Sequence, residues 1–351
     1  MFGLFGKKSV GWVGVDIGSS SVKVVALTGQ GEQLRLDSYA VVSLPSGVVT
    51  DGAIQDAAAV ANAVEQAVRI SGTALKRGIV AVPASSVITK RLELSDAFTE
   101  MELEDQIRVE ADQFIPYALD EVALDFEVLG PANGHAGLND ILLVACRRDQ
   151  VDQREDALAG SGLKCDVVDV DSYAIERVMP LLTREVPENA LVGLVDIGAT
   201  TLTLNVFRGN QIVYSREQAF GGAELVRAIQ LQYNIEEDEV VNALRRNEVS
   251  DEIREMVLLP FRGTVVQQIS RALQFFYSSE AHSQLDQLLL MGGTALLDGV
   301  ADQLQEEEGV PTLLANPFAA MNCNPKYSTD QIQRDAPSLV KACGLALRAT
   351  S

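Results

Sequence analysis

The sequence has 351 residues, 47% of them hydrophobic, and its 49 acidic and 28 basic residues give a formal net charge of −21. A chain of this length is enough for roughly two to four domains with a sizeable core. The acidic balance argues against nucleic acid or an anionic membrane surface as a direct partner, because phosphate groups need a basic footprint.

The chain opens with the segment "MFGLFGKK". Its lysines follow the apolar residues, which is the wrong order for a signal peptide, and Asp16 interrupts what comes next. We expect a frayed end here, with a tail that touches a membrane or a partner as the alternative. No window approaches about 18 uninterrupted apolar residues, so we expect no transmembrane helix.

The two halves of the chain share one pattern of predicted elements. The first half reads "GWVGVDIG", "SSSVKVVALTG" and "QLRLDSYAVVSL", and the second reads "LVGLVDIG", "ATTLTLNVFRG" and "NQIVYSREQAF". Each half predicts three antiparallel strands joined by short turns and followed by a helix, over Ala53–Ile70 and Ala223–Tyr233. Further strands come after helices, so a duplicated mixed sheet with packed helices is the simplest organisation.

Two insertions interrupt this repeat. Val82–Cys165 contains strand, acidic helix, strand, strand, helix and strand patterns, and this β-α-β-β-α-β order predicts a small domain of its own. Asn234–Leu259 predicts a short acidic helical insertion, and the long amphipathic pattern "PFRGTVVQQISRALQFFYSS" follows it. We expect the linker between the halves over Leu182–Ala190.

Each half carries a turn with the composition of a phosphate-binding loop. In "DIGSSS", which includes Gly18, successive backbone N–H groups can form an anion nest, and the serine hydroxyls add hydrogen bonds. Lys23, on the following strand, would bring a positive charge to a β- or γ-phosphate. "DIGATT" offers Gly198, Thr200 and Thr201 in the same places. A single copy is equally typical of an ordinary β-turn, but two equivalent copies favour phosphate binding.

The aspartate in each turn suggests a metal ion. A carboxylate beside a triphosphate is repulsive unless a divalent cation lies between them. Because Mg²⁺ keeps several of its waters, Asp16 and Asp196 would hold those waters from opposite sides.

A glycine pair precedes a helix at two further places. Gly292-Gly293-Thr294 follows a buried strand, where a backbone turn and a helix N-terminus would approach a ligand; helix capping by Thr294 is the alternative. "FGGAELVRAI" places Gly222 before a helix, with Glu224 available to a ribose hydroxyl. No G-x-G-x-x-G opens a helix and no G-x-x-x-x-G-K-[ST] occurs, which excludes the Rossmann and P-loop readings.

Cysteine and histidine chemistry is poorly supported. The four cysteines are far apart and form no C-x-x-C, so we expect reduced thiols in a cytosolic protein. The two histidines, His135 and His282, have no second ligand at zinc spacing, and His135 falls in a predicted turn. We therefore expect neither a zinc site nor a histidine-dependent hydrolase.

Five motifs in order carry a family resemblance. "DIGSSSVK", "DVDSYAI", "DIGATT", "MGGTALLDG" and "SLVKACGLAL" resemble the phosphate 1, connect 1, phosphate 2, adenosine and connect 2 motifs of the actin-like ATPase superfamily, over nearly the whole chain. The inserted unit resembles the FtsA-type (SHS2) subdomain. "MFGLFGKK" leading into "VGVDIGSSSVK", and "VEADQFIP" in the insertion, resemble the PilM family of type IV pilus assembly proteins.

The resemblance implies an α/β, actin-like, two-lobed fold built from duplicated ribonuclease-H-like halves. It implies a first lobe of residues 1–81 and 166–185 with a C-terminal helix over 337–351, and an inserted FtsA-type β-α-β-β-α-β subdomain over 82–165. A second lobe over 190–233 and 260–336 and a small helical subdomain over 234–259 complete the expected domains.

The resemblance also implies a site for ATP or ADP with Mg²⁺ between the lobes. Its cofactor-binding residues would be those of the phosphate, ribose and adenosine contacts: Gly18, Ser19, Ser20, Ser21, Lys23, Asp196, Gly198, Ala199, Thr200, Thr201, Gly222, Glu224, Gly292, Gly293 and Thr294. Relatives that hydrolyse ATP well have a polar catalytic residue near connect 1, where the candidates here are Asp169, Asp171 and Ser172. Asn242 stands where many relatives have a lysine, which leaves adenine contacts from that helix, and fast turnover, open.

The implied function is that of an ATP-binding cytoplasmic scaffold. It would bind the cytoplasmic N-terminus of the inner-membrane protein PilN, between the inserted domain and the first-half core, and so stay at the inner membrane. Nucleotide state would then be coupled to pilus assembly and twitching motility. Other pilus assembly proteins, including the assembly ATPases, and self-association are further candidate partners. The acidic helix Glu100–Ile115 is also explained as an ordinary solvated face.

Two other functions share this fold. An FtsA-like cell-division protein would carry an amphipathic membrane helix after a C-terminal linker, whereas this sequence ends in "ACGLALRATS". A small-molecule kinase would need a substrate-binding base and larger insertions around the cleft, and no clear set of residues provides them.

Overall fold

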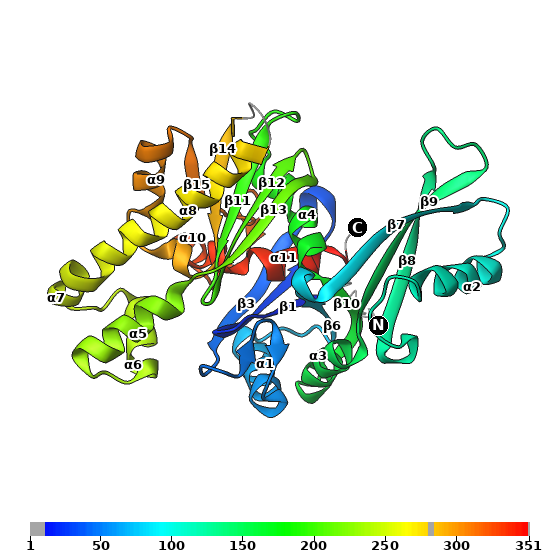
Figure 1. Ribbon diagram of the computed structural model, residues 1–351. Coiled ribbons are helices and arrows are strands. Elements are labelled where there is room, and N and C mark those ends of the chain that lie inside the picture. Colours follow the sequence, from blue (N-terminus) through cyan, green and yellow to red (C-terminus); the bar gives the residue numbers. More distant parts are fainter. Residues whose placement is uncertain (1–10, 280–283, 350–351) are drawn as a thin grey trace, which may run out of the picture.

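The computed structural model describes residues 11–279 and 284–349. The predicted N-terminal tail and His282 lie outside these residues. Within them the chain forms two lobes about a central helix, with a smaller sheet at one end (Figure 1). No helix in these two ranges has the length and apolar character needed to span a bilayer.

The first lobe is built on a six-stranded sheet in the order β10-β6-β1-β2-β3-β16. β1, β2 and β3 form the antiparallel meander that the sequence predicts, and β6 and β10 add in parallel. Side chains alternate across β2, so Val22 and Val24 pack with α1 while Val25 packs with α4 and α11 on the other face. The elements are β1 (Val13–Ile17), β2 (Ser21–Thr28), β3 (Arg35–Ser43), β6 (Arg77–Val82), β10 (Lys164–Val170), β16 (Asn322–Cys323), α1 (Ala57–Ser71), α4 (Asp171–Leu182) and α11 (Val340–Leu347).

Two details of this lobe differ from the sequence prediction. The helix predicted from Ala53 begins at Ala57, because the Asp56 side chain caps it by accepting a hydrogen bond from the Ala59 N–H at 3.0 Å. The two residues Ala53–Ile54 form β5 and pair with β4 (Val49–Thr50) instead. The short strand β16 comes from the stretch expected in the second lobe, and it pairs with β3 of the first.

The second lobe repeats the meander in a five-stranded sheet with the order β13-β12-β11-β14-β15. Helix α8 buries Val265, Ile269 and Leu273 against this sheet. Helices α5 to α7 form a small group at one end of the molecule, around Leu225 and Val240 (Figure 1). The elements are β11 (Leu191–Ile197), β12 (Thr201–Arg208), β13 (Gln211–Ala219), β14 (Gln287–Met291), β15 (Thr312–Leu314), α5 (Gly222–Tyr233), α6 (Glu237–Arg246), α7 (Asp251–Ile253), α8 (Leu259–Ser279), α9 (Val300–Glu308) and α10 (Thr329–Asp335).

The insertion forms its own three-stranded sheet in the order β7-β9-β8 at the opposite end from α5 and α6 (Figure 1). Helix α2 buries Ile107 and Ala111 against Ile141 and Leu143 of this sheet. The strands and the helix are β7 (Val87–Ser95), β8 (Val122–Pro131), β9 (Leu138–Arg147) and α2 (Glu100–Ala111).

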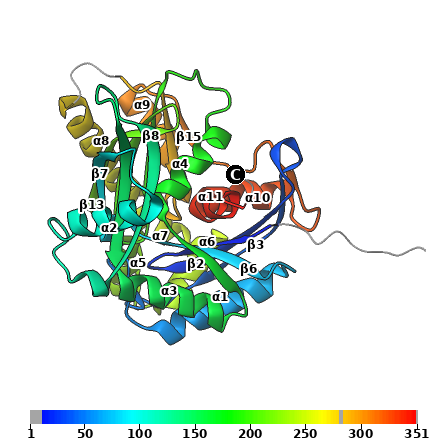
Figure 2. The same ribbon diagram turned by 90° about the vertical axis from the view of Figure 1, so that its right-hand side faces the viewer.

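The last helix and strand of the predicted β-α-β-β-α-β unit join the first lobe. β10 pairs with β6, and α3 (Arg148–Gly160) lies beside α1 in both views (Figures 1 and 2). Arg154 of α3 explains this placement, because its buried guanidinium donates to the carbonyls of Ala81 at 2.8 Å and Gly52 at 2.6 Å. The order of elements alone does not say which sheet a helix covers.

Helix α11 lies at the centre of the molecule, between the sheet of the first lobe and α4 (Figure 1). Two glycines allow this close packing. A Cβ at Gly14 of β1 would lie 2.0 Å from the Ala342 carbonyl oxygen, and a Cβ at Gly344 would lie 1.9 Å from that of Ala174 on α4. The backbones of β1, α11 and α4 are therefore in contact, which fixes the position of Lys341 on α11.

Candidate functional site

The two predicted phosphate loops are hairpins closed by the same hydrogen bond. In the first hairpin (Asp16–Lys23) the Gly18 N–H donates to Ser21 O at 3.0 Å, and in the second (Asp196–Thr203) the Gly198 N–H donates to Thr201 O at 2.9 Å. The hairpins also touch each other, since the Thr200 hydroxyl donates to Ser19 Oγ at 3.2 Å. The internal repeat therefore places two equivalent turns against each other, one from each lobe.

A large cavity lies between the lobes at these turns. Its volume is about 1590 Å³, above the roughly 300–1,000 Å³ of an ordinary small-molecule site. Fourteen of the fifteen residues predicted to bind the cofactor line it, together with Asp16. Glu224 is the exception, because it is exposed on α5 and does not belong to the lining, whereas its neighbour Leu225 does.

Each predicted metal-binding aspartate forms an ion pair with a lysine. Lys23 Nζ lies 3.1 Å from Asp16 Oδ2 across the first hairpin. Lys341 Nζ lies 2.8 Å from Asp196 Oδ2 and 3.2 Å from Asp171 Oδ2, so α11 of the first lobe supplies the partner of the second hairpin. Burial acts to lower the pKa of Lys341, but the carboxylates of Asp196, Asp171 and Asp16 outweigh burial and raise the pKa well above its ordinary value. The ammonium is therefore charged.

The glycine-pair turn at 292–294 supports the second hairpin. Gly292 has a φ of +91°, and a Cβ there would lie 2.4 Å from the Ile197 carbonyl oxygen, so only glycine fits. The Thr294 hydroxyl donates to Gly198 O at 2.9 Å, and the Gly222 N–H donates to the same oxygen at 3.0 Å. Both glycine-pair turns thus hold the second phosphate hairpin in place.

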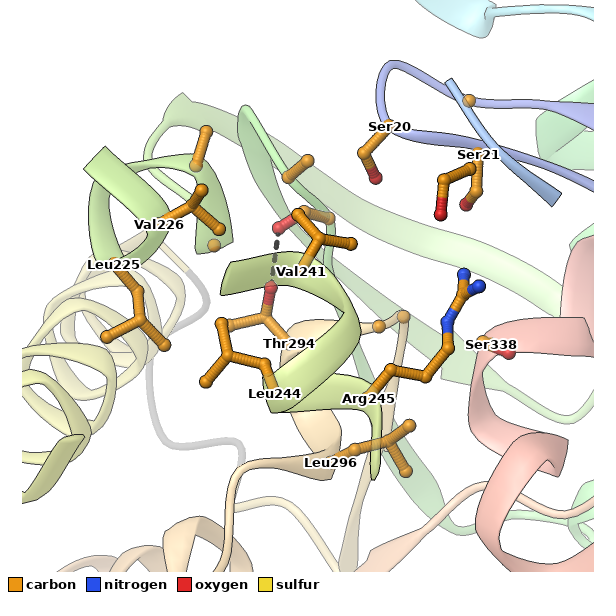
Figure 3. A pocket seen from close by; sticks show the side chains of 18 of the residues that line it. Ser20, Ser21, Leu225, Val226, Val241, Leu244, Arg245, Thr294, Leu296 and Ser338 are labelled. Atoms are coloured by element: carbon orange, nitrogen blue, oxygen red, sulfur yellow. Dashed lines mark hydrogen bonds between the residues drawn. The ribbon is translucent and has the colours of Figure 1, made fainter. Parts of the chain in front are cut away.

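The far side of the cavity is apolar, and the sequence analysis missed it. Figure 3 shows aliphatic side chains around Thr294, while Arg245 extends from α6 toward the side where Ser20, Ser21 and Ser338 lie. An aliphatic wall of this kind suits the apolar faces of an organic ring. At the rim of this side, the Ser46 hydroxyl of the first lobe donates to the Glu237 carboxylate at the start of α6. The aliphatic side chains that line this wall are Leu225, Val226, Val241, Leu244 and Leu296.

The three candidate catalytic residues do not line the cavity. Asp169 is buried and paired, with Oδ2 at 3.2 Å from Arg177 Nη2 and 2.9 Å from Arg348 Nη1. Asp171 accepts from the Ala84 N–H at 2.8 Å and contacts Lys341. Ser172 is partly buried at the start of α4.

The residues present give a metal ion only partial support. In the described part of the chain no three His, Cys, Asp or Glu side chains are grouped so as to hold one. Water-mediated binding of Mg²⁺ by Asp16 and Asp196 needs no such group and stays a prediction. Any metal there would compete with Lys23 and Lys341 for the same carboxylates.

Lys341 lines the cavity and pairs with Asp196, but the motif "SLVKACGLAL" alone assigns this residue no role. A lone lysine in an otherwise apolar helix is the signal, because such a side chain needs a buried anionic partner.

Comparisons with known proteins agree with this architecture. A family model described as "Type IV pilus assembly protein PilM" matches residues 14–350. The chain is similar to the solved PilM–PilN type IV pilus biogenesis complex, with 27% identity, a TM-score of 0.77, and coverage of 98% of this chain and 99% of the other. It is also similar in fold to the ethanolamine utilization protein EutJ from Carboxydothermus hydrogenoformans, with 18% identity, a TM-score of 0.56, and coverage of 96% and 89%. The predicted two-lobed, actin-like fold is confirmed.

Proposed function

Because the chain belongs to the type IV pilus assembly protein PilM family, we propose that it is a nucleotide-binding scaffold of the pilus assembly complex at the inner membrane. Nucleotide binding is supported mainly by the two equivalent hairpins, one from each lobe, that face the same cavity. Backbone N–H groups at 19–21 and 199–201 would bind the phosphates, and Lys23 would add a charge-assisted contact.

The base and ribose would lie toward α5 and α6. The Gly292–Thr294 turn and the aliphatic wall from Leu225 to Leu296 would contact adenosine. ATP and ADP both fit this description. If Mg²⁺ enters with the nucleotide, Asp16 and Asp196 would hold its waters, although both carboxylates already pair with a lysine.

Hydrolysis by this chain would be slow. A general base must reach the attacking water, and Asp169, Asp171 and Ser172 do not line the cavity. We expect turnover below about 1 s⁻¹, the low end of ordinary enzyme rates, with ATP alone. Steady phosphate release above that rate would contradict a scaffold role.

The proposed partner is the cytoplasmic N-terminus of a PilN protein. The support is the similarity to a solved PilM–PilN complex, which covers nearly the whole of both chains. Such a partner would hold a cytoplasmic protein at the membrane. Since nucleotide would contact both lobes, it would favour the closed form and change the affinity for the peptide by its differential binding to the two forms.

A peptide titration tests this function. The N-terminal peptide of the PilN protein from the same organism is titrated into the full chain with and without ATP, and a scrambled peptide of equal composition is the control. We expect specific binding that is tighter with ATP. Absence of specific binding with and without ATP would contradict PilN as the partner. It would not bear on nucleotide binding, which the ADP titration tests.

A further inference from the structure

Lys341 has the geometry of a fixed cation between two carboxylates. Its ammonium carries three N–H donors, of which Asp196 at 2.8 Å and Asp171 at 3.2 Å take two. The side chain is 23% exposed and lines the cavity that holds both phosphate hairpins. One donor is therefore left for an anion in the cavity.

The second hairpin needs a cation from elsewhere. In the first hairpin Asp16 faces Lys23 across the strand pair, whereas in the second hairpin the same register places the neutral Thr203 opposite Asp196. Lys341 fills this role from α11 of the first lobe. Each hairpin thus has one ammonium beside its aspartate. In the first hairpin the lysine belongs to the hairpin itself, whereas in the second it comes from α11.

This arrangement leaves little need for a divalent ion. Both carboxylates predicted to hold the waters of Mg²⁺ already accept an ion pair with a lysine. An incoming Mg²⁺ would displace these ion pairs or lie close to two positive charges, which repel it by Coulomb's law. An ammonium held by two carboxylates costs no such displacement.

We propose that the Lys341 ammonium is the built-in counter-charge for the nucleotide phosphates in the second half of the site, so that nucleotide binding depends little on a divalent cation. This inference rests on the proposed nucleotide binding and identifies Lys341 as the positive charge that neutralises the phosphates. The free N–H of Lys341 would donate to a phosphate oxygen while Asp196 and Asp171 hold the ammonium in place.

Calorimetric titration of ADP into the full chain, in excess Mg²⁺ and in EDTA, tests the proposal. The variants are Lys341→Met and the charge-balanced pair Lys341→Met with Asp171→Asn, whose amide oxygen can still accept from the Ala84 N–H. Lys164→Met is the matched control, because Lys164 is 79% exposed and pairs with Asp166 on β10, outside the cavity lining. Thermal unfolding of each variant reports whether it is folded.

We expect the ADP dissociation constant of the native chain to change by less than about threefold between Mg²⁺ and EDTA. Either Lys341 variant should bind about tenfold or more weakly in EDTA and recover in Mg²⁺, because loss of one charge-assisted contact has this size and a metal can then enter. A tenfold loss by the native chain in EDTA would overturn the proposal, as would equal binding by the Lys341 and Lys164 variants. Absence of ADP binding by every protein in both buffers would overturn the proposed function together with this inference.

Discussion

The two phosphate hairpins share a backbone and differ in what supports them. Both close with a glycine N–H bonded to the carbonyl three residues later. The first hairpin contains its own cation, Lys23, and the Leu44 N–H supports this hairpin by donating to Ser20 O at 2.8 Å. The cation beside the second hairpin is Lys341 of α11. The Thr294 hydroxyl and the Gly222 N–H both donate to Gly198 O. The two halves thus share the glycine-closed turn, while each lobe supports that turn through different contacts.

The largest expected effect comes from the support of the second hairpin. Gly292→Ala should lower the free energy of unfolding by roughly 2–5 kcal/mol, because it adds a left-handed backbone penalty to a collision with Ile197 O. Gly137→Ala is the matched control, since Gly137 has a φ of +83° with no atom within 4 Å of its added Cβ, and it should cost only about 1–2 kcal/mol. Urea unfolding measures both. Equal losses would show that the Gly292 turn does not pack tightly on the second hairpin.

The cation of the first hairpin should matter for both nucleotide binding and folding. Lys23→Met should weaken ADP binding about tenfold or more, because it removes a charge-assisted phosphate contact. The Lys23 and Asp16 side chains are only 14% and 16% exposed, so the variant leaves the Asp16 carboxylate without its partner and should lower the free energy of unfolding by about 1–3 kcal/mol. Calorimetry and urea unfolding separate the two effects. Unchanged ADP affinity would mean that the first hairpin binds through its backbone alone.

The Thr294 hydroxyl should have a smaller effect. Thr294→Val keeps the shape and removes one hydrogen bond to Gly198 O, which still accepts from the Gly222 N–H. We expect a loss of about 1 kcal/mol in the free energy of unfolding and a modest loss of ADP affinity. A loss of stability larger than that for Gly292→Ala would show that the Thr294 hydroxyl, rather than the Gly292 turn, is the main support of the second hairpin.

The contact between Ser46 and Glu237 should have the smallest effect. This pair is exposed at the rim of the cavity, so Ser46→Ala should change ADP affinity by less than about threefold. A tenfold change in the calorimetric affinity would instead assign the rim contact a role in holding the lobes closed.

The hairpins were predictable because their chemistry is local and repeated. Lys341 was not, because its ion pairs join three elements that are distant in the chain, and no spacing rule links "SLVKACGLAL" to Asp196. The sequence offers Glu224 as a ribose contact, but the buried face of α5 contains Leu225 and Ile229, and Glu224 does not line the cavity. The placement of α3 with the first lobe likewise depends on Arg154, whose partners lie far away in sequence.

A titration with ADP tests whether both hairpins bind the same nucleotide. ADP is titrated into the native chain and into Gly18→Val and Gly198→Val, which place a branched side chain at equivalent positions of the two turns. We expect one ADP bound per native chain and a loss of ADP affinity of about tenfold or more for each variant, because either side chain would block one turn. Unchanged affinity in either variant would contradict a site shared by the two lobes.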